Sequence, residues 1–360
     1  MTQVLLVNPR TPEAEIIARA AECLRSGGLV AFPTETVYGL GAHAMDAAAV
    51  RRVFAAKGRP ASDPLIVHIA GASHLGRVAA RVPPLAHALA SQFWPGPLTL
   101  VLPRGADVPA EVTAGGETVA VRIPSHPVAQ ALLRAAGVPV AAPSANLFSR
   151  PSPTRAEHVL QDLDGRIDMI LDGGAAMVGI ESTVLDLTTV PPRVLRHGAV
   201  TIEMLRMVVP DVAMAAEVGV DVEGGSIAHS PGLLAKHYSP RAPLTLYVGR
   251  PDARRPQMVA AAIALTAGGQ RVGVLATRED APAFRNAGVH AVEDLGAADD
   301  LISIAARLYA ALRELDTAGV DVILAAGVGE AGESAQEGGG LAAALRDRLR
   351  RAAAGHIVRV

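Results

Sequence analysis

The sequence predicts a two-domain α/β protein. The chain is long enough, at 360 residues, to bury a large core, and 50% of it is hydrophobic. Short apolar runs that end in polar, Gly or Pro residues fill the first part, which predicts a mixed, twisted open sheet with helices forming a concave site. From residue 244 strands and helices alternate regularly, which favours a smaller parallel α/β domain. We expect the first domain at 1–209, a linker at 210–242 and the second domain at 243–360.

The first domain combines helical periodicity with short apolar strands. A Gly27-Gly28 stop ends the first helix, and Asp46 caps the helix that delivers Lys57 and Arg59 at its C-terminal end. In chain order, the predicted helices are 13–25, 46–56, 83–93 and 126–136, with another opened by 151–154, and the predicted strands are 29–32, 65–70, 98–102, 118–123, 138–142, 169–172, 180–186 and 194–198. Polar residues follow many of these strands, and ligands of such sheets commonly lie at strand ends. After the strand at 29–32, Pro33 and a polar turn of threonines, a carboxylate and two glycines through Gly41 are expected to stop the backbone pairing.

The linker and second domain have different patterns. The linker is too rich in Pro and Gly for a helix, but Lys236, His237 and Tyr238 favour a function over a passive tether. The second domain is expected to be Rossmann-like, although acidic residues around Gly327 and Gly329 argue against a bound nucleotide there. Its predicted segments are 244–248, 259–266, 271–276, 281–286, 301–315, 320–325 and 341–353.

Composition excludes several classes of protein. Net charge is −2 and only 3% of residues are aromatic, which argues against a dedicated nucleic-acid-binding module. The single cysteine, Cys23, lies in a helical pattern and is expected to be a core residue. No signal peptide or membrane-spanning run is expected, so we predict a cytoplasmic enzyme with no membrane association.

Positive charge is provided almost entirely by arginine. Of 33 Lys and Arg residues only Lys57 and Lys236 are lysines, which suggests a role as a compact charge on phosphate, although chance survival of two exposed lysines is the simpler alternative. Cations and hydroxyls recur at strand ends of the first domain: Lys57, Arg59, Arg122 and Arg196 with Thr34, Thr36, Ser144 and Ser182. Each has a simpler explanation, because strand-end arginines often form surface ion pairs and turn hydroxyls often bond their own backbone. Together they suit a polyanionic substrate.

Ordered motifs across the first domain and linker resemble those of one family. They are Pro33-Thr-Glu-Thr-Val-Tyr-Gly-Leu-Gly41, Lys57-Gly-Arg-Pro60, Pro64-Leu-Ile-Val-His-Ile69, Val119-Ala-Val-Arg-Ile-Pro124, Ala142-Pro-Ser-Ala-Asn146, Glu181-Ser-Thr183, Leu195-Arg-His-Gly198 and Ser230-Pro-Gly-Leu-Leu-Ala-Lys-His-Tyr-Ser-Pro240. This set resembles the L-threonylcarbamoyladenylate synthase family in its two-domain form. The second domain resembles it more weakly, mainly by position and α/β pattern.

The resemblance implies an enzyme that converts L-threonine, bicarbonate or CO2, and ATP into threonylcarbamoyl-AMP and pyrophosphate. A downstream threonylcarbamoyl transferase would use the product to modify tRNAs that read ANN codons. The implied ATP-binding residues are Lys57, Arg59, Asp63, Thr118, Ser144, Ser152, Arg196 and Tyr238, the last folding over the nucleotide. The implied threonine-binding residues are Thr34, Thr36, His68, Arg122, Ala142 and Ser182. His68 alone, in an apolar strand, would more simply be an interior histidine.

The implied chemistry needs positioning and charge neutralisation, without a covalent nucleophile. Mg²⁺ is expected with ATP, held by phosphate oxygens and water rather than by a protein metal site. Asp63 stands where the family usually has Asn, so its carboxylate would repel the triphosphate unless Mg²⁺ or an arginine offsets it. We expect it to contact the ribose or the metal shell.

Two alternative functions remain open at this stage. The first is a protein that binds double-stranded RNA or tRNA. Weak RNA binding is also compatible with the synthase itself. The second is a carbamoyl-transfer enzyme that acts on another amine.

Overall fold

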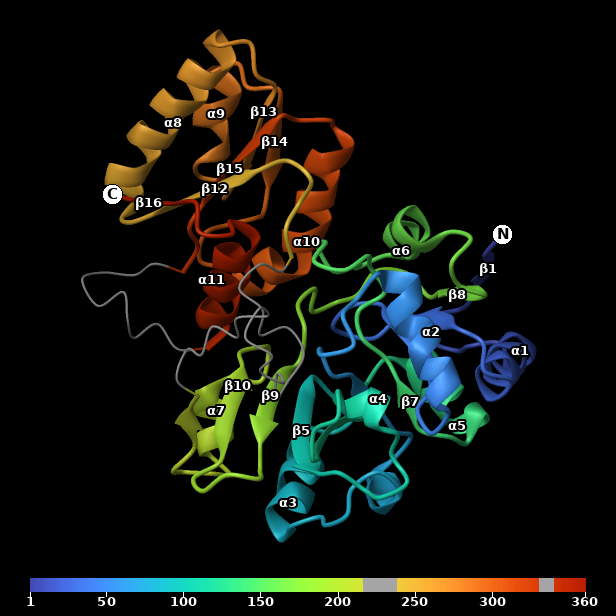
Figure 1. Cartoon of the computed structure of the whole chain (residues 1–360). Coiled ribbons are helices and arrows are strands. Elements are labelled where there is room, and N and C mark those ends of the chain that lie inside the picture. Colours follow the sequence, from blue (N-terminus) through green and yellow to red (C-terminus); the bar gives the residue numbers. More distant parts are fainter. Residues whose placement is uncertain (216–237, 330–339) are drawn as a thin grey trace. The chain divides into compact units, whose positions relative to one another are not determined.

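The computed structural model describes residues 1–215, 238–329 and 340–360. They form two compact units (Figure 1). The first holds Met1–Phe148 and the described part of Ser152–Leu234, and the second holds Ser149–Pro151 and the described part of Ala235–Val360.

The first unit is built on a mixed sheet. Its described residues give 11 strands in the spatial order β1-β8-β2-β3-β7-β4-β6-β5-β9-β10-β11. Parallel and antiparallel neighbours alternate irregularly: β4 is parallel to β6, whereas β7 is antiparallel to β4 and β5 is antiparallel to β6. The strands are β1 (Gln3–Leu6), β2 (Val30–Phe32), β3 (Gly39–His43), β4 (Ile66–His68), β5 (Leu98–Pro103), β6 (Thr118–Arg122), β7 (Val140–Ala141), β8 (Met169–Asp172), β9 (Thr183–Asp186), β10 (Arg193–Arg196) and β11 (Ala213–Met214). The predicted mixed sheet is confirmed.

Helices cover both faces of this sheet. Its helices are α1 (Ala14–Arg25), α2 (Ala47–Lys57), α3 (Pro84–Phe93), α4 (Ala110–Thr113), α5 (Pro127–Ala136), α6 (Ala156–Leu163) and α7 (Ile202–Arg206), with a 3-10 helix at Ala72–Arg77. Alternate residues of β2 enter different cores: Phe32 belongs to a core that includes residues of α1 and α5, whereas Ala31 belongs to one that includes residues of α2, α3 and α6. This follows from the two-residue period of a strand.

Helix α2 places Lys57. Asp46 caps the helix by accepting hydrogen bonds from the amides of Ala48 and Ala49, as predicted. Gly58 ends it in the left-handed conformation, at φ 63°. The last helical residue, Lys57, is thereby fixed at the start of the Lys57-Gly-Arg-Pro60 motif.

Strand β3 differs from the expected polar turn. The glycines at 39 and 41 predicted a turn through Gly41, but the chain resumes pairing at Gly39 and runs antiparallel to β2. A Cβ on Gly41 would lie 2.9 Å from the ring of Phe32 and 2.9 Å from Val140. The glycine therefore serves close packing between strands rather than a turn.

The second unit has a sheet in which all described neighbours are parallel, in the order β14-β13-β15-β12-β16. Its elements are β12 (Leu244–Val248), α8 (Pro251–Ala267), β13 (Val272–Ala276), α9 (Ala281–Asn286), β14 (Ala291–Asp294), α10 (Leu301–Thr317), β15 (Val322–Ala326), α11 (Gly340–Ala352) and β16 (Ile357–Arg359). The predicted parallel α/β domain is confirmed. Helix α8 begins at Pro251, earlier than the expected segment 259–266, and contains Pro256.

Several predictions fall on residues outside the described ranges. These include Lys236, His237, most of the Ser230–Pro240 motif and the acidic loop beyond Gly329. Within the ranges that the structure describes, no helix has the length and apolar character needed to cross a bilayer.

Candidate active site

Arg122 connects several of the predicted site residues. It is the last residue of β6 and pairs in register with His68, the last residue of β4. Its buried guanidinium donates from Nη1 to Thr36 Oγ1 at 2.9 Å and from Nε to the carbonyl of Gly96 at 3.2 Å. Its Nη2 lies 2.8 Å from Oε1 of Glu35 in an ion pair. A fixed guanidinium of this kind suits a carboxylate ligand.

The turn between β2 and β3 is held by Thr34. Its hydroxyl donates to the carbonyl of Val37 at 2.6 Å and accepts from the amides of Thr36 and Val37. It also lies 2.9 Å from the Thr36 hydroxyl. Thr34 thus bonds its own turn, which is the simpler alternative recognised from the sequence, and it presents Glu35 and Thr36 toward Arg122.

His68 is buried beside Arg122. Burial in the apolar interior, aided by the neighbouring Arg122 charge, lowers the pKa of His68 to about 3. Its ring meets Phe32 edge to face, with the ring centroids 6.2 Å apart. At neutral pH the imidazole is therefore uncharged and can serve only as a neutral hydrogen-bonding or packing group.

Ser182 and Arg196 form a second group next to Arg122. Arg196 donates to the Ser182 carbonyl at 3.1 Å and to its hydroxyl at 3.2 Å. The Ser182 hydroxyl also lies 2.8 Å from that of Thr99, the residue that pairs with Arg122 across β5 and β6. The antiparallel β5–β6 pairing therefore brings these side chains together.

Lys57 joins a third group. Its buried ammonium donates to the carbonyls of Ser144 and Asn146, each at 2.5 Å. The amide of Phe148 in turn donates to the Lys57 carbonyl at 2.9 Å. The lysine therefore fixes the Pro143–Asn146 loop against the end of α2, in addition to supplying positive charge.

Arg59 and Asp63 form a buried ion pair. Nη2 of Arg59 lies 2.9 Å from Oδ2 of Asp63, and both side chains are at most 4% exposed. Arg59 also donates to the carbonyls of Asp63 and Pro64. Burial raises the pKa of Asp63, while Arg59, then Lys57, and more weakly Arg196 oppose that rise. The carboxylate thus lies among the cations proposed for ATP, and pairing with an arginine offsets its charge.

The remaining predicted residues have varied placements. Ser152 donates to Oε1 of Glu181 at 2.5 Å, and Ala142 is buried after β7. Tyr238 belongs to the second unit, where its ring lies 5.4 Å from that of Tyr309. That Tyr238 covers the nucleotide stays a prediction.

The predicted residues extend along the strands rather than meeting at one edge. Since β7 is antiparallel to β4, Ser144 follows β7 at the end opposite His68. Thr118 begins β6 and Arg122 ends it, so about 13 Å separate them at a rise of roughly 3.3 Å per residue. A site of this length can hold an extended ligand.

Some contacting residues were missed. Glu35, Thr99 and Asn146 each contact a predicted residue, yet only Glu35 carried a usable signal, because it is a carboxylate enclosed by two threonines in a motif already singled out. Thr99 lies within an apolar strand, and the contact of Asn146 uses its carbonyl, which no side-chain pattern reveals.

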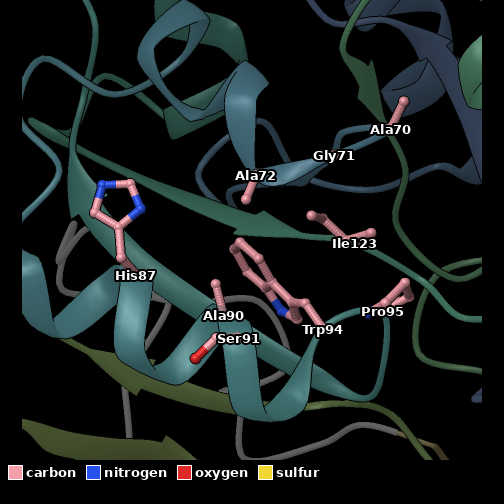
Figure 2. Close-up of a pocket in the computed structure, with 9 residues that line it drawn as sticks. All are labelled: Ala70, Gly71, Ala72, His87, Ala90, Ser91, Trp94, Pro95 and Ile123. Atoms are coloured by element: carbon pink, nitrogen blue, oxygen red, sulfur yellow. The ribbon is translucent and has the colours of Figure 1, made fainter.

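A cavity of about 310 Å³ lies beyond the ends of β4 and β6, between α3 and the residues that follow His68. Figure 2 shows the Trp94 indole between α3 and Ile123. Its lining residues are Ala70, Gly71, Ala72, His87, Ala90, Ser91, Trp94, Pro95 and Ile123. None of the predicted site residues is among them, so this mostly apolar hollow adjoins the Arg122 group without containing it.

Comparisons with known proteins cover the whole chain. A family model described as "Telomere recombination" matches residues 22–198, and one described as "Threonylcarbamoyl-AMP synthase, C-terminal domain" matches residues 200–354. Threonylcarbamoyl-AMP synthase of Pyrococcus abyssi is 43% identical over 361 residues, covering 100% of both chains. The Bacillus subtilis protein of the same name is 44% identical over 344 residues, covering 95% of this chain and 94% of its own.

A solved structure agrees with these relatives. The crystal structure of P. abyssi Sua5 complexed with L-threonine matches with a TM-score of 0.90 and 43% identity, and covers 100% of both chains. Full-length identity, agreement in fold and both family models lead to the same conclusion. The chain belongs to the two-domain threonylcarbamoyl-AMP synthase family.

Proposed function

We propose that this protein synthesises threonylcarbamoyl-AMP and pyrophosphate from L-threonine, bicarbonate or CO2, and ATP, for threonylcarbamoyladenosine modification of tRNA. The observation that carries the proposal is the full-length 43% identity to a threonylcarbamoyl-AMP synthase. The buried Arg122 group and the cations Lys57, Arg59 and Arg196 give this chain receptors for a carboxylate and for phosphates.

In this proposal Arg122 binds the threonine carboxylate. Its guanidinium is oriented by Thr36 and Gly96, so little conformational entropy is lost when the carboxylate arrives. Thr36, Ser182 and the neutral His68 provide groups for the rest of the amino acid. The relative bound to L-threonine supports this assignment by similarity of the whole chain.

The phosphates are proposed to lie near Lys57, Arg59 and Arg196. The charges of all three residues oppose the rise in the pKa of Asp63, which indicates that they lie close enough together to act on one ligand. Threonine's amine would add to CO2 to form a carbamate, and a carbamate oxygen would then displace pyrophosphate from the α-phosphorus. Residues that hold the two reactants in line supply most of the acceleration in such a reaction.

Mg²⁺ would be carried mainly by the phosphate oxygens. Asp63 fits a role toward such an ion, because its carboxylate is buried and its Oδ1 accepts no hydrogen bond from the described residues, while its Oδ2 pairs with Arg59. Bound Mg²⁺ would neutralise charge on the phosphates. The described residues hold no group of three or more His, Cys, Asp or Glu side chains with metal-site geometry.

The test is pyrophosphate release from ATP by the full chain. We expect release only when L-threonine and bicarbonate are both present, with Arg122→Lys as the variant that loses it. Release with another amino acid in place of threonine would favour carbamoyl transfer to a different amine. An inert ATP combined with salt-sensitive RNA binding would instead favour the RNA-binding alternative.

A further inference from the structure

Glu35 provides an anionic group in a site otherwise described by its cations. We propose that the Glu35 carboxylate receives the ammonium group of the amino-acid substrate, so that Glu35 and Arg122 together recognise a zwitterion. This inference rests on the proposed function, which makes an α-amino acid the ligand of Arg122.

The first support is the burial of the carboxylate. The Glu35 side chain is 4% exposed and that of Arg122 is 5% exposed, and their charged atoms lie 2.8 Å apart. A buried carboxylate is costly unless its charge is paired and its oxygens accept hydrogen bonds. Arg122 provides the paired charge, so the first of these two conditions is met.

The second support is that hydrogen bonding to the carboxylate is incomplete. Neither Oε1 nor Oε2 of Glu35 accepts a hydrogen bond within the described part of the chain, and Nη2 of Arg122 donates none there. The other two guanidinium nitrogens of Arg122 each donate one hydrogen bond, Nη1 to Thr36 and Nε to Gly96. The two charges are therefore paired, but the Glu35 oxygens can still accept hydrogen bonds and Nη2 of Arg122 can still donate one. A ligand that both donates and accepts hydrogen bonds would use these atoms.

The third support is the order of the charges. An α-amino acid carries its carboxylate and ammonium groups on the same carbon atom. Arg122 and Glu35 present the complementary charges side by side, and His68, uncharged at neutral pH, adds no competing cation. A ligand with the carboxylate but without the ammonium would meet Glu35 as a repulsive group.

This arrangement has a consequence for the proposed reaction. The nitrogen held at Glu35 is the atom that must attack CO2. The ammonium first gives one proton to solvent, and the lone pair of the resulting amine forms the N–C bond as one C–O π bond of CO2 opens. The nitrogen then releases a second proton to solvent, which leaves the carbamate anion. Anchoring it would fix the position of the developing carbamate relative to the nucleotide. Glu35 would thus discriminate amino acids from hydroxy acids and also orient the nucleophile.

The experiment compares two ligands with matched proteins by titration calorimetry. The ligands are L-threonine and the 2,3-dihydroxybutanoate of the same configuration, in which a hydroxyl replaces the amine, both titrated with a non-hydrolysable ATP analogue present. The proteins are the wild type, Glu35→Gln and the control Glu117→Gln, which changes an exposed carboxylate before β6. Loss of one partner of a buried charge pair costs about 2 kcal/mol or more, or roughly 30-fold in affinity.

We expect Glu35→Gln to weaken L-threonine at least about 30-fold while the hydroxy acid loses less than about threefold. Glu117→Gln should match the wild type for both ligands. Equal losses of both ligands in Glu35→Gln would show that Glu35 only holds Arg122 in place, and unchanged selectivity would show that it does not contact the ammonium. Either result overturns the inference.

A second variant keeps the test decisive if Glu35→Gln does not fold. Glu35→Asp retains the charge on a shorter side chain, so it should weaken L-threonine more than the hydroxy acid, and equal effects on both would overturn the inference. Failure of the wild type to bind either ligand would overturn the proposed function itself. Tight binding of threonine by the wild type, with selectivity that ignores Glu35, would overturn only the role of Glu35.

Discussion

Replacing Asp63 with Asn tests how the site balances its charge. The change removes a carboxylate 2.9 Å from the Arg59 guanidinium, in a pair at most 4% exposed. Coulomb attraction at that distance is about 6 kcal/mol at an effective dielectric constant of 20, and desolvation of both ions offsets much of it. Removing one partner of such a pair costs about 3–5 kcal/mol, and the Asn carbonyl can recover part of this.

We therefore expect Asp63→Asn to lower the stability of the ligand-free protein by about 2–3 kcal/mol, or roughly 4–12 °C in melting temperature for a unit of this size. ATP affinity should move the other way. Lys57, Arg59 and Arg196 all act on Asp63, so removing its charge frees their field for the triphosphate. We expect about tenfold tighter ATP binding at low Mg²⁺ and a smaller gain at saturating Mg²⁺.

The assays are thermal unfolding and ATP titration across a Mg²⁺ series, with the exposed Asp107→Asn as the control. Unchanged ATP affinity at every Mg²⁺ concentration would remove Asp63 from the site. Weaker ATP binding confined to high Mg²⁺ would show that contact of Asp63 with the metal shell outweighs its repulsion of the triphosphate, and would refute the predicted gain in ATP affinity.

Three further predictions follow from the described contacts. Lys57→Ala should abolish most pyrophosphate release and, because two loop carbonyls lose their donor, also lower unfolding free energy by about 1–3 kcal/mol, whereas wild-type turnover would refute its role. His68, with its pKa lowered to about 3, should show no NMR titration between pH 5 and 8. Because its folded pKa is below its unfolded one, its stabilising contribution is present above pH 6.5 and is lost as pH falls from 6.5 toward 3. Burial and the adjacent Glu314 raise the pKa of Glu293 to about 7, so stability should fall between about pH 4.5 and 7, and Glu293→Gln should raise stability by about 1 kcal/mol at pH 8 but not at pH 4 by chemical denaturation.

The sequence predicted elements well where periodicity and local signals agree. Helix α2, with Asp46 as its cap and Gly58 at its end, was found because capping acts through neighbouring residues. Strand β3 was missed because Gly39 and Gly41 carry no β signal, and Gly41 is required by the close approach of Phe32 on the adjacent strand. That requirement depends on tertiary packing, which local patterns do not contain.

The same distinction applies to the site. Arg122 and Lys57 were found because charged residues next to apolar strands and helices are conspicuous. Their partners were harder to find, because the Arg122–Glu35 pair joins residues on β6 and on the β2–β3 turn that only the sheet order brings together. The expectation of a single strand-end site was too simple, since the antiparallel β7 places Ser144 away from His68.

Two buried ion pairs give the site an asymmetry between its proposed substrates. Arg122 is neutralised by Glu35 and Arg59 by Asp63, so the ligand-free protein buries no uncompensated guanidinium at either position. A zwitterionic amino acid brings its own cation for Glu35, so its binding should not depend on a divalent ion. ATP brings no cation for Asp63. When the phosphates engage Arg59, bound Mg²⁺ would therefore be the counter-charge for the Asp63 carboxylate. Titrations should accordingly show strong Mg²⁺ dependence for ATP, reduced in Asp63→Asn, and none for L-threonine when a nucleotide analogue is already bound; Mg²⁺ dependence of equal size for both ligands would contradict this account of the two pairs.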